Sequence, residues 1–262
     1  MKPKKNKIKL KKRRIVGFLI GLSFLSIFLG ISKIDKKNFF VEAQESNDYK
    51  MKEILQNEEA YPKELIELAL EKEETRDFVY KYIENQEQAK KINIKDEYVE
   101  GEFPLFIQWD ERWGYNLYGD NYIAINGCGP TTLAMVVVGL TGDTTINPKV
   151  VADFSYNNGY YVEDVGTKWD LMTEGAKAFG IQGEEIPLSE NVILKALQRG
   201  EPIIASMRPG TFTTSGHFVL LTGVTEDGKI IVHDSDSIKR SSDTWDIDVF
   251  MKETKNLWKF SI

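Results

Sequence analysis

The segment that most constrains the fold is 128–140, CGPTTLAMVVVGL, which composition predicts to be a helix with apolar side chains on nearly every side. A helix without a polar face must be buried, so other parts of the chain have to cover it from several directions. The chain has 262 residues and one cysteine, Cys128, so no intramolecular disulfide can stabilise it. We therefore expect a domain with a sizeable hydrophobic core around this helix.

The remaining patterns indicate an α+β fold. Helices are predicted over 167–179, ending at Gly180, and over 189–199, with Ser189 as the N-cap and Gly200 as the stop. Strands are predicted in PIIASM, HFVLLTGV and KIIVHDSD, and the turn TEDG joins the last two. DIDVFMKET is predicted to be a short helix and NLWKFSI a closing strand. Helices followed by antiparallel strands are typical of the α+β class rather than of alternating α/β folds.

The amino-terminal region has the pattern of an export segment. The first fourteen residues contain nine lysines and arginines and no acidic residue, and the run 15–31 is uncharged and mostly apolar. Its length is near the lower limit for a membrane span, so a cleaved signal peptide and a retained anchor both stay open. VEA at 41–43 resembles a signal-peptidase site. Either route puts the following chain outside the cytoplasm, with the amino terminus cytoplasmic if it is uncleaved.

Charge and composition change at the end of the export segment, near residue 43. Residues 1–43 carry twelve basic and two acidic side chains, net +10, whereas 44–262 carry twenty-two and thirty-eight, net −16. An acidic body argues against a nucleic-acid partner. Residues 44–100 are charged, free of glycine and helical in their periodicity, which predicts an accessory helical segment. From Gly101 a second, aromatic-rich part predicts a single domain over 101–262.

Cys128 is a candidate nucleophile. The amides and dipole at the start of its helix favour an anion and so the thiolate form. A nucleophilic thiol needs a base, and the chain has two histidines, His217 and His233. His217 opens a strand beside the loop RPGTFTTSG, and the TEDG hairpin brings it near Asp234, a carboxylate that can orient an imidazole. His233 points to the opposite face from Asp234, so it is the weaker candidate. The alternative is a buried cysteine that only packs in the core.

One further residue is a candidate for the site, and the spacing of others argues against a metal site. Gln108, in PLFIQWDERWGY, is a candidate oxyanion donor together with the Cys128 backbone N–H. Asp234, Asp236 and Asp243 lack the spacing and glycine of an EF-hand calcium loop. His233 next to Asp234 lacks the further ligands of a zinc site. We therefore expect no metal and no other cofactor, and no catalytic role for Asp236.

Five segments carry a family resemblance: QWDERWGY, NGCGPTTLAMV, GTKWDLMTEGA, PGTFTTSGHFVLLTG and HDSDS. Together with the helical segment before them, they resemble exported papain-like cysteine peptidases of Gram-positive bacteria, similar to the bacteriocin-processing, double-glycine type of cysteine peptidase family thirty-nine. The resemblance implies a papain-like fold in which a helical part with the nucleophile packs on an antiparallel sheet. It implies Cys128 as the nucleophile, His217 as the base, Asp234 as its orienter and Gln108 at the oxyanion.

The chain departs from the family pattern at one motif. Where the family has a sequence like DPNS, this chain has DSDS, with Ser235 in place of proline and Asp236 in place of asparagine. The carboxylate expected to orient the base, Asp234, is retained.

Three functions are compatible with these residues. The leading one is an exported thiol peptidase that acts on peptides or proteins. A second keeps the same residues but acts on the stem peptides or amide bonds of peptidoglycan in the cell envelope. A third is a non-catalytic module that binds a peptide. For the helices in 44–100, a spacer, an inhibitory cover and a docking element all stay open, as does the oligomeric state.

Overall fold

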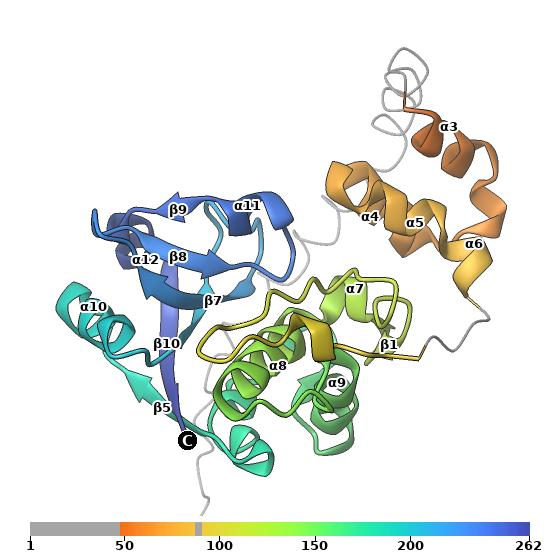
Figure 1. Ribbon diagram of the computed structural model, residues 1–262. Helices are drawn as coiled ribbons and strands as arrows, with labels where there is room; N and C mark the ends of the chain where they lie inside the picture. The colour runs from red at the N-terminus through yellow and green to blue at the C-terminus, as the bar shows by residue number, and fades with distance from the viewer. Residues whose placement is uncertain (1–47, 87–90) are drawn as a thin grey trace, which may run out of the picture. The chain divides into compact units, whose positions relative to one another are not determined.

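The computed structural model describes residues 48–86 and 91–262 (Figure 1). The apolar run 15–31 and the possible cleavage site 41–43 lie outside the described residues. Within the described ranges, no helix combines the length and the apolar character needed to cross a membrane. Residues Glu53–Ile262 form one compact unit, which includes most of the accessory helical segment as well as the predicted domain over 101–262.

Short helices make up the described part of the accessory segment. They are α3 (Tyr49–Gln56), η1 (Glu58–Ala60), α4 (Lys63–Glu71), η2 (Glu73–Thr75), α5 (Arg76–Tyr80) and α6 (Tyr82–Asn85). α4 is amphipathic and buries Leu65, Ile66, Leu68 and Ala69 on one face. α5 buries Phe78, whose ring stacks on Tyr115 at a centroid distance of 4.2 Å. The helical periodicity of this segment therefore reflects real amphipathic helices.

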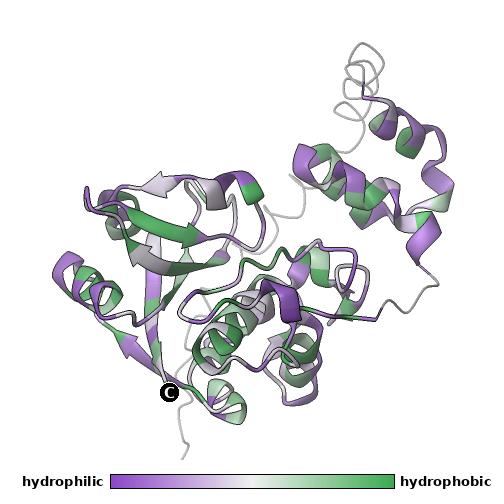
Figure 2. Ribbon diagram, in the orientation of Figure 1, coloured by the Kyte–Doolittle hydropathy of each residue, from purple (hydrophilic) through white to green (hydrophobic). Residues whose placement is uncertain are grey.

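The buried helix predicted around Cys128 is confirmed as α8 (Cys128–Thr141). All its residues from Gly129 to Val138 are buried. It ends where Gly142 adopts a left-handed conformation (φ 70°) and donates its N–H to the Val138 carbonyl at 2.9 Å. Figure 2 shows much of this helix in the colour of hydrophobic residues. Its burial accounts for the position of the main core.

A six-stranded antiparallel sheet forms the other half of the domain, in the order β5-β10-β6-β7-β8-β9. Its strands are β5 (Gln182–Ile186), β6 (Ile203–Met207), β7 (His217–Val224), β8 (Ile230–His233), β9 (Thr244–Trp245) and β10 (Thr254–Ser261). The strands predicted in the carboxyl-terminal half are thus confirmed, and their combination with helices confirms the mixed α+β class. β5, a charged edge strand that is purple in Figure 2, was not predicted.

The two faces of the sheet pack against different helices. Phe218 and Leu220 of β7 belong to the same core as α8, whereas Val219 and Leu221 belong to a second core. The second core includes residues of α10 (Glu190–Gln198) and α12 (Ile247–Glu253). α8 therefore covers one face of the sheet, and α10 and α12 cover the other (Figure 1). Period-two alternation along β7 produces this division.

The prediction of a continuous helix over 167–179 is wrong. This stretch contains β4 (Gly166–Thr167) and two short 3-10 helices, η4 (Trp169–Met172) and η5 (Ala176–Phe179). Thr167 pairs with Tyr161 in a small hairpin, and its hydroxyl lies 2.9 Å from the Tyr118 hydroxyl. These tertiary contacts hold Thr167 in an extended conformation and override the local helical pattern.

The helix α9 (Pro148–Asn157) was not predicted, although its start has a clear signal. Asn147 is its N-cap and accepts hydrogen bonds from the N–H groups of Lys149 and Val150, with Pro148 in the first turn. The remaining elements are η3 (Lys95–Glu97), β1 (Leu117–Tyr118), β2 (Asn121–Tyr122), α7 (Ile123–Asn126), β3 (Tyr161–Val162) and α11 (Ile238–Ser242).

Candidate active site

Cys128 occupies the first position of α8, as the sequence predicted. Its side chain is partly exposed and forms no disulfide. Both flanking glycines are required by close contacts, because a Cβ on Gly127 would lie 2.4 Å from the Ile123 carbonyl oxygen and one on Gly129 would lie 2.6 Å from Thr167 Oγ1. The thiol is therefore presented at a helix start that tolerates no side chain on either side of it.

His217 and Asp234 are in direct contact. The ring nitrogen Nε2 of His217 lies 2.7 Å from Oδ1 of Asp234, which confirms the proximity expected from the hairpin. His217 is 7 % exposed and Asp234 is fully buried, so water competes little for this contact. Because Nε2 faces the carboxylate, Nδ1 is the ring nitrogen left for Cys128, whose proximity contributes to raising the pKa of His217.

The electrostatics of the pair favour the charged forms of both residues. Burial by itself disfavours the imidazolium, but the charge and hydrogen bond of Asp234 and the Cys128 side chain outweigh it and raise the pKa of His217 to about 10. Burial also disfavours the carboxylate, yet His217 and Arg240 lower the pKa of Asp234 to about 2. At neutral pH the site thus contains a protonated imidazole held against a carboxylate.

Gln108 is buried between the nucleophile and the Asp234 loop. Its Nε2 donates to the Ala124 carbonyl at 2.9 Å, and its Oε1 accepts a hydrogen bond from Ser235 Oγ at 3.1 Å. Its backbone N–H donates to the Ser235 carbonyl at 2.7 Å. The amide is thereby oriented with its nitrogen toward the segment that precedes Cys128, and Gln108 and Cys128 line the same pocket.

This pocket, of about 630 Å³, brings together residues from distant parts of the chain. Besides Gln108, Cys128 and His217, it is lined by Glu71, Lys72, Ile125, Gly210, Thr211, Phe212, Thr213, Thr214, Ser215, Gly216, Asp236 and Arg240. One wall is the loop before β7, which Glu253 holds in place by accepting hydrogen bonds from the backbone N–H and hydroxyl of Thr211 at 2.7 and 2.8 Å.

Two residues at the site, Arg240 and Lys72, were not predicted from the sequence. Arg240 donates from Nε to Oδ2 of Asp234 at 2.5 Å, and Lys72 forms an ion pair with Asp236. Arg240 lies four residues after Asp236 at the start of a helix, which is a spacing that favours an ion pair. Lys72 had no such signal, because 164 residues separate it from Asp236.

Asp236 has more contacts than the sequence suggested. It is 7 % exposed, its backbone N–H donates to Asp234 Oδ1 at 2.8 Å, and its carboxylate contacts Lys72 and Arg240. Asp236 therefore lies at the site, while the expectation that it has no catalytic role stays a prediction.

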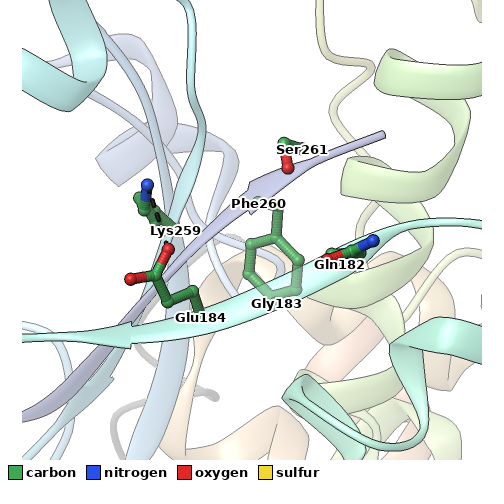
Figure 3. Close-up of a pocket in the computed structure, with 6 residues that line it drawn as sticks. All are labelled: Gln182, Gly183, Glu184, Lys259, Phe260 and Ser261. Carbon is green, nitrogen blue, oxygen red and sulfur yellow. Dashed lines mark ion pairs between the residues drawn. The ribbon is translucent and has the colours of Figure 1, made fainter.

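His233 lies apart from the pocket. Its Nδ1 contacts the Pro104 carbonyl at 3.2 Å, and burial lowers its pKa. A second, smaller hollow lies over β5 and β10, where the ion pair of Lys259 and Glu184 spans the two strands (Figure 3). It shares no lining residue with the pocket around Cys128. In 48–86 and 91–262, no three His, Cys, Asp or Glu side chains form a metal-binding group.

The opposite shifts of the two histidines predict a difference that NMR can measure. At pH 8 we expect His217 to be protonated on both ring nitrogens and His233 to be neutral, because only His217 contacts a carboxylate. The chain has two histidines, so nitrogen-15-labelled histidine in protein made without a polyhistidine tag gives two assignable sets of signals. His233→Gln should remove the neutral set, and two neutral imidazoles at pH 8 would contradict the ion pair.

The raised pKa of His217 also makes the free energy of unfolding depend on pH. Because the folded-state pKa of His217 is above its ordinary value of 6.5, its contribution to the free energy of unfolding is complete below about pH 6.5. This contribution is lost as the pH rises toward about 10. Asp234 behaves in the opposite way, because its pKa is lowered: its contribution is present above pH 3.8 and is lost as the pH falls through about 2.

Comparison with known proteins assigns most of the chain to a family. A family model described as the Peptidase_C39 like family matches residues 100–260, the part that contains most of the residues lining the pocket. A search of the curated proteins finds no match. The match spans more than half of the chain and includes Cys128, His217 and Asp234. The chain therefore belongs to the Peptidase_C39 like family.

Proposed function

We propose that the protein is a thiol-dependent peptidase with a papain-like fold, in which Cys128, His217 and Asp234 act as nucleophile, base and orienter. The observation that carries this proposal is the contact of His217 Nε2 with Asp234, which leaves Nδ1 to a partly exposed cysteine at a helix start. A buried cysteine that only packs in a core has no need of a protonated imidazole and a buried carboxylate beside it.

The reaction follows from these positions. The Cys128 thiolate attacks the carbonyl carbon of a peptide bond and forms a C–S bond, while the negative charge moves to the carbonyl oxygen. The Cys128 backbone N–H and Gln108 Nε2 stabilise that oxygen. Protonated His217 gives its Nδ1 proton to the leaving amine, and the C–N bond breaks. A water molecule, deprotonated by His217, then hydrolyses the acyl-enzyme and regenerates the thiolate.

Asp234 and Gln108 act through the groups they contact. Asp234 holds the imidazole in the orientation that keeps Nδ1 toward sulfur and stabilises its positive charge. Gln108 is fixed by its contacts with Ala124 and Ser235. Its Nε2 also donates to the Ile125 carbonyl through a long contact of 3.4 Å, and this is the hydrogen that would turn to the oxyanion. None of these steps calls for a metal or an organic cofactor.

The substrate class is tested by offering two candidates to the same preparation. Purified full-length protein and Cys128→Ala are incubated with a mixed peptide library and, separately, with cell-wall sacculi, and the products are weighed by mass spectrometry. Cys128-dependent cleavage of library peptides supports a peptidase, whereas fragments released only from sacculi identify the wall-peptide hydrolase. Retention of peptides without any cleavage would overturn the enzymatic proposal in favour of a binding module.

We also propose that the domain acts on the outer side of the cell membrane, with the amino terminus inside if the apolar run 15–31 is retained. The basis is the block of basic residues before that run, which resists translocation. Protease added to intact cells is expected to remove the part over 101–262. Full protection until lysis would contradict this topology, and a cytoplasmic marker protein controls for leakage.

A further inference from the structure

Two buried carboxylates lie side by side in the loop after β8. Asp234 is fully buried and Asp236 is 7 % exposed, and the Asp236 backbone N–H donates to Asp234 Oδ1 at 2.8 Å. Both carboxylates also contact the Arg240 guanidinium, and buried charges of the same sign are costly unless each is compensated by an opposite charge. The family pattern has a neutral asparagine at the position of Asp236. The second buried negative charge is therefore a feature of this chain.

The two counter-ions come from different parts of the chain. Arg240 Nε contacts Asp234 Oδ2 at 2.5 Å, and its NH2 group lies 3.5 Å from Asp236 Oδ2, which is a long contact. The close contact of the Asp236 carboxylate is instead with the ammonium group of Lys72. The other oxygen of Asp236, Oδ1, is buried and has no hydrogen-bond partner among the described residues. Without Lys72, Asp236 would be left with Arg240, which it would share with Asp234.

Lys72 is held in this position by the accessory segment. It follows α4, donates its backbone N–H to the Leu68 carbonyl at 3.0 Å, and its own carbonyl accepts from Thr75 Oγ1 at 2.7 Å. Two residues later, Glu74 accepts hydrogen bonds from Ser237 Oγ at 2.5 Å and from the Lys239 N–H at 3.1 Å, at the start of α11. The turn between α4 and α5 therefore binds the loop after β8 at two points, through Lys72 and through Glu74.

We propose that Lys72 is a positioning residue for the reaction: it neutralises Asp236, so that Arg240 stays with Asp234 and Asp234 stays with His217. The proposal rests on the proposed function for its catalytic meaning. It gives the accessory helices a role that differs from a spacer or a removable cover, because they supply a charge on which the geometry of the site depends. Lys72 also lines the pocket next to Glu71, so this turn forms part of its wall.

The test is a charge-rescue experiment in the full-length chain. The variants are Lys72→Met, Asp236→Asn and the double variant, and the readouts are the rate of Cys128 alkylation by iodoacetamide at pH 7 and kcat on a cleaved peptide. We expect Lys72→Met to lower both by a factor on the order of ten, the scale of removing the hydrogen-bond partner of a metal ligand, which likewise acts through another residue. Asp236→Asn in that background should restore them, because no buried charge is then left unpaired. Lys72→Arg should retain both.

Lys81→Met is the matched control. Lys81 is another lysine of the accessory segment that binds the rest of the unit, through an ion pair with Glu111 at 2.9 Å, and it does not line the pocket. Equal defects in Lys72→Met and Lys81→Met, or no rescue by Asp236→Asn, would mean that Lys72 only docks the segment, and would overturn the proposal. If Lys72→Met does not fold, the double variant decides: alkylation at the wild-type rate supports the proposal and a slow rate overturns it.

The two readouts separate this inference from the proposed function. Alkylation requires only the thiolate and its neighbours, so it responds to Lys72 whether or not a peptide is cleaved. Absence of peptide cleavage by wild type together with rescue of alkylation would overturn the peptidase and leave the positioning role in place. Cleavage by wild type with no response to Lys72→Met would do the opposite.

Discussion

Replacing Cys128 by alanine is expected to lower peptide hydrolysis by a factor on the order of 10⁶, the scale at which losing a catalytic nucleophile abolishes turnover. The fold should survive, because the side chain is partly exposed at the first position of α8 and its removal opens little cavity. Hydrolysis assays and thermal unfolding of the two proteins measure these effects. A large loss of stability with unchanged hydrolysis would instead assign Cys128 to the core.

Alkylation provides a second view of the same thiol. Because the chain has one cysteine, the intact mass after treatment with iodoacetamide reports on Cys128 alone. We expect rapid modification of the native protein at pH 7 and slow modification of His217→Ala, because that variant removes the base and the positive charge beside the sulfur. His233→Gln is the control, because His233 contacts Pro104 and does not line the pocket. Resistance of native Cys128 until denaturant is added would contradict the proposed nucleophile.

Replacing Asp234 by asparagine is expected to lower turnover by up to about 10⁴-fold, the loss caused by a wrong histidine tautomer in a catalytic triad. The carboxylate accepts from two donors at once, His217 Nε2 on Oδ1 and Arg240 Nε on Oδ2. An asparagine amide has one oxygen, and we expect the permanently charged Arg240 to donate its hydrogen bond to that oxygen. The NH2 group then faces Nε2 and selects the tautomer that carries its proton on Nδ1, toward sulfur.

A double variant tests whether Arg240 causes this loss. In Asp234→Asn, the added change Arg240→Met frees the amide oxygen for the Nε2–H of His217, so part of the turnover should return. Asp243→Ala should leave turnover and thermal unfolding unchanged, because this aspartate is exposed and lies outside the pocket. Full activity in Asp234→Asn would mean that another group orients His217.

Much of the fold could be predicted from the sequence, because the burial of a helix and the pairing of two strands across a short turn depend on neighbouring residues. The apolar run after Cys128 could only be a buried helix, and α8 has the predicted start and ends within one residue of the predicted end. The pairing of β7 and β8 followed from their lengths and the turn between them, and it brought His217 to Asp234. By contrast, the segment after Gly166 failed as a helix, because Thr167 is held by Tyr161 and Tyr118.

The sequence by itself determined where the proposed nucleophile, base and orienter lie, since each sits at an element boundary with its own local signature. Only the tertiary structure decided how the charges around them are balanced. Arg240 and Lys72 reach Asp234 and Asp236 through contacts that depend on how α4, α11 and the sheet pack, and Lys72 does so across 164 residues of chain. A buried charge is stabilised by whatever cation the fold brings within a few ångströms, and sequence spacing does not encode that distance.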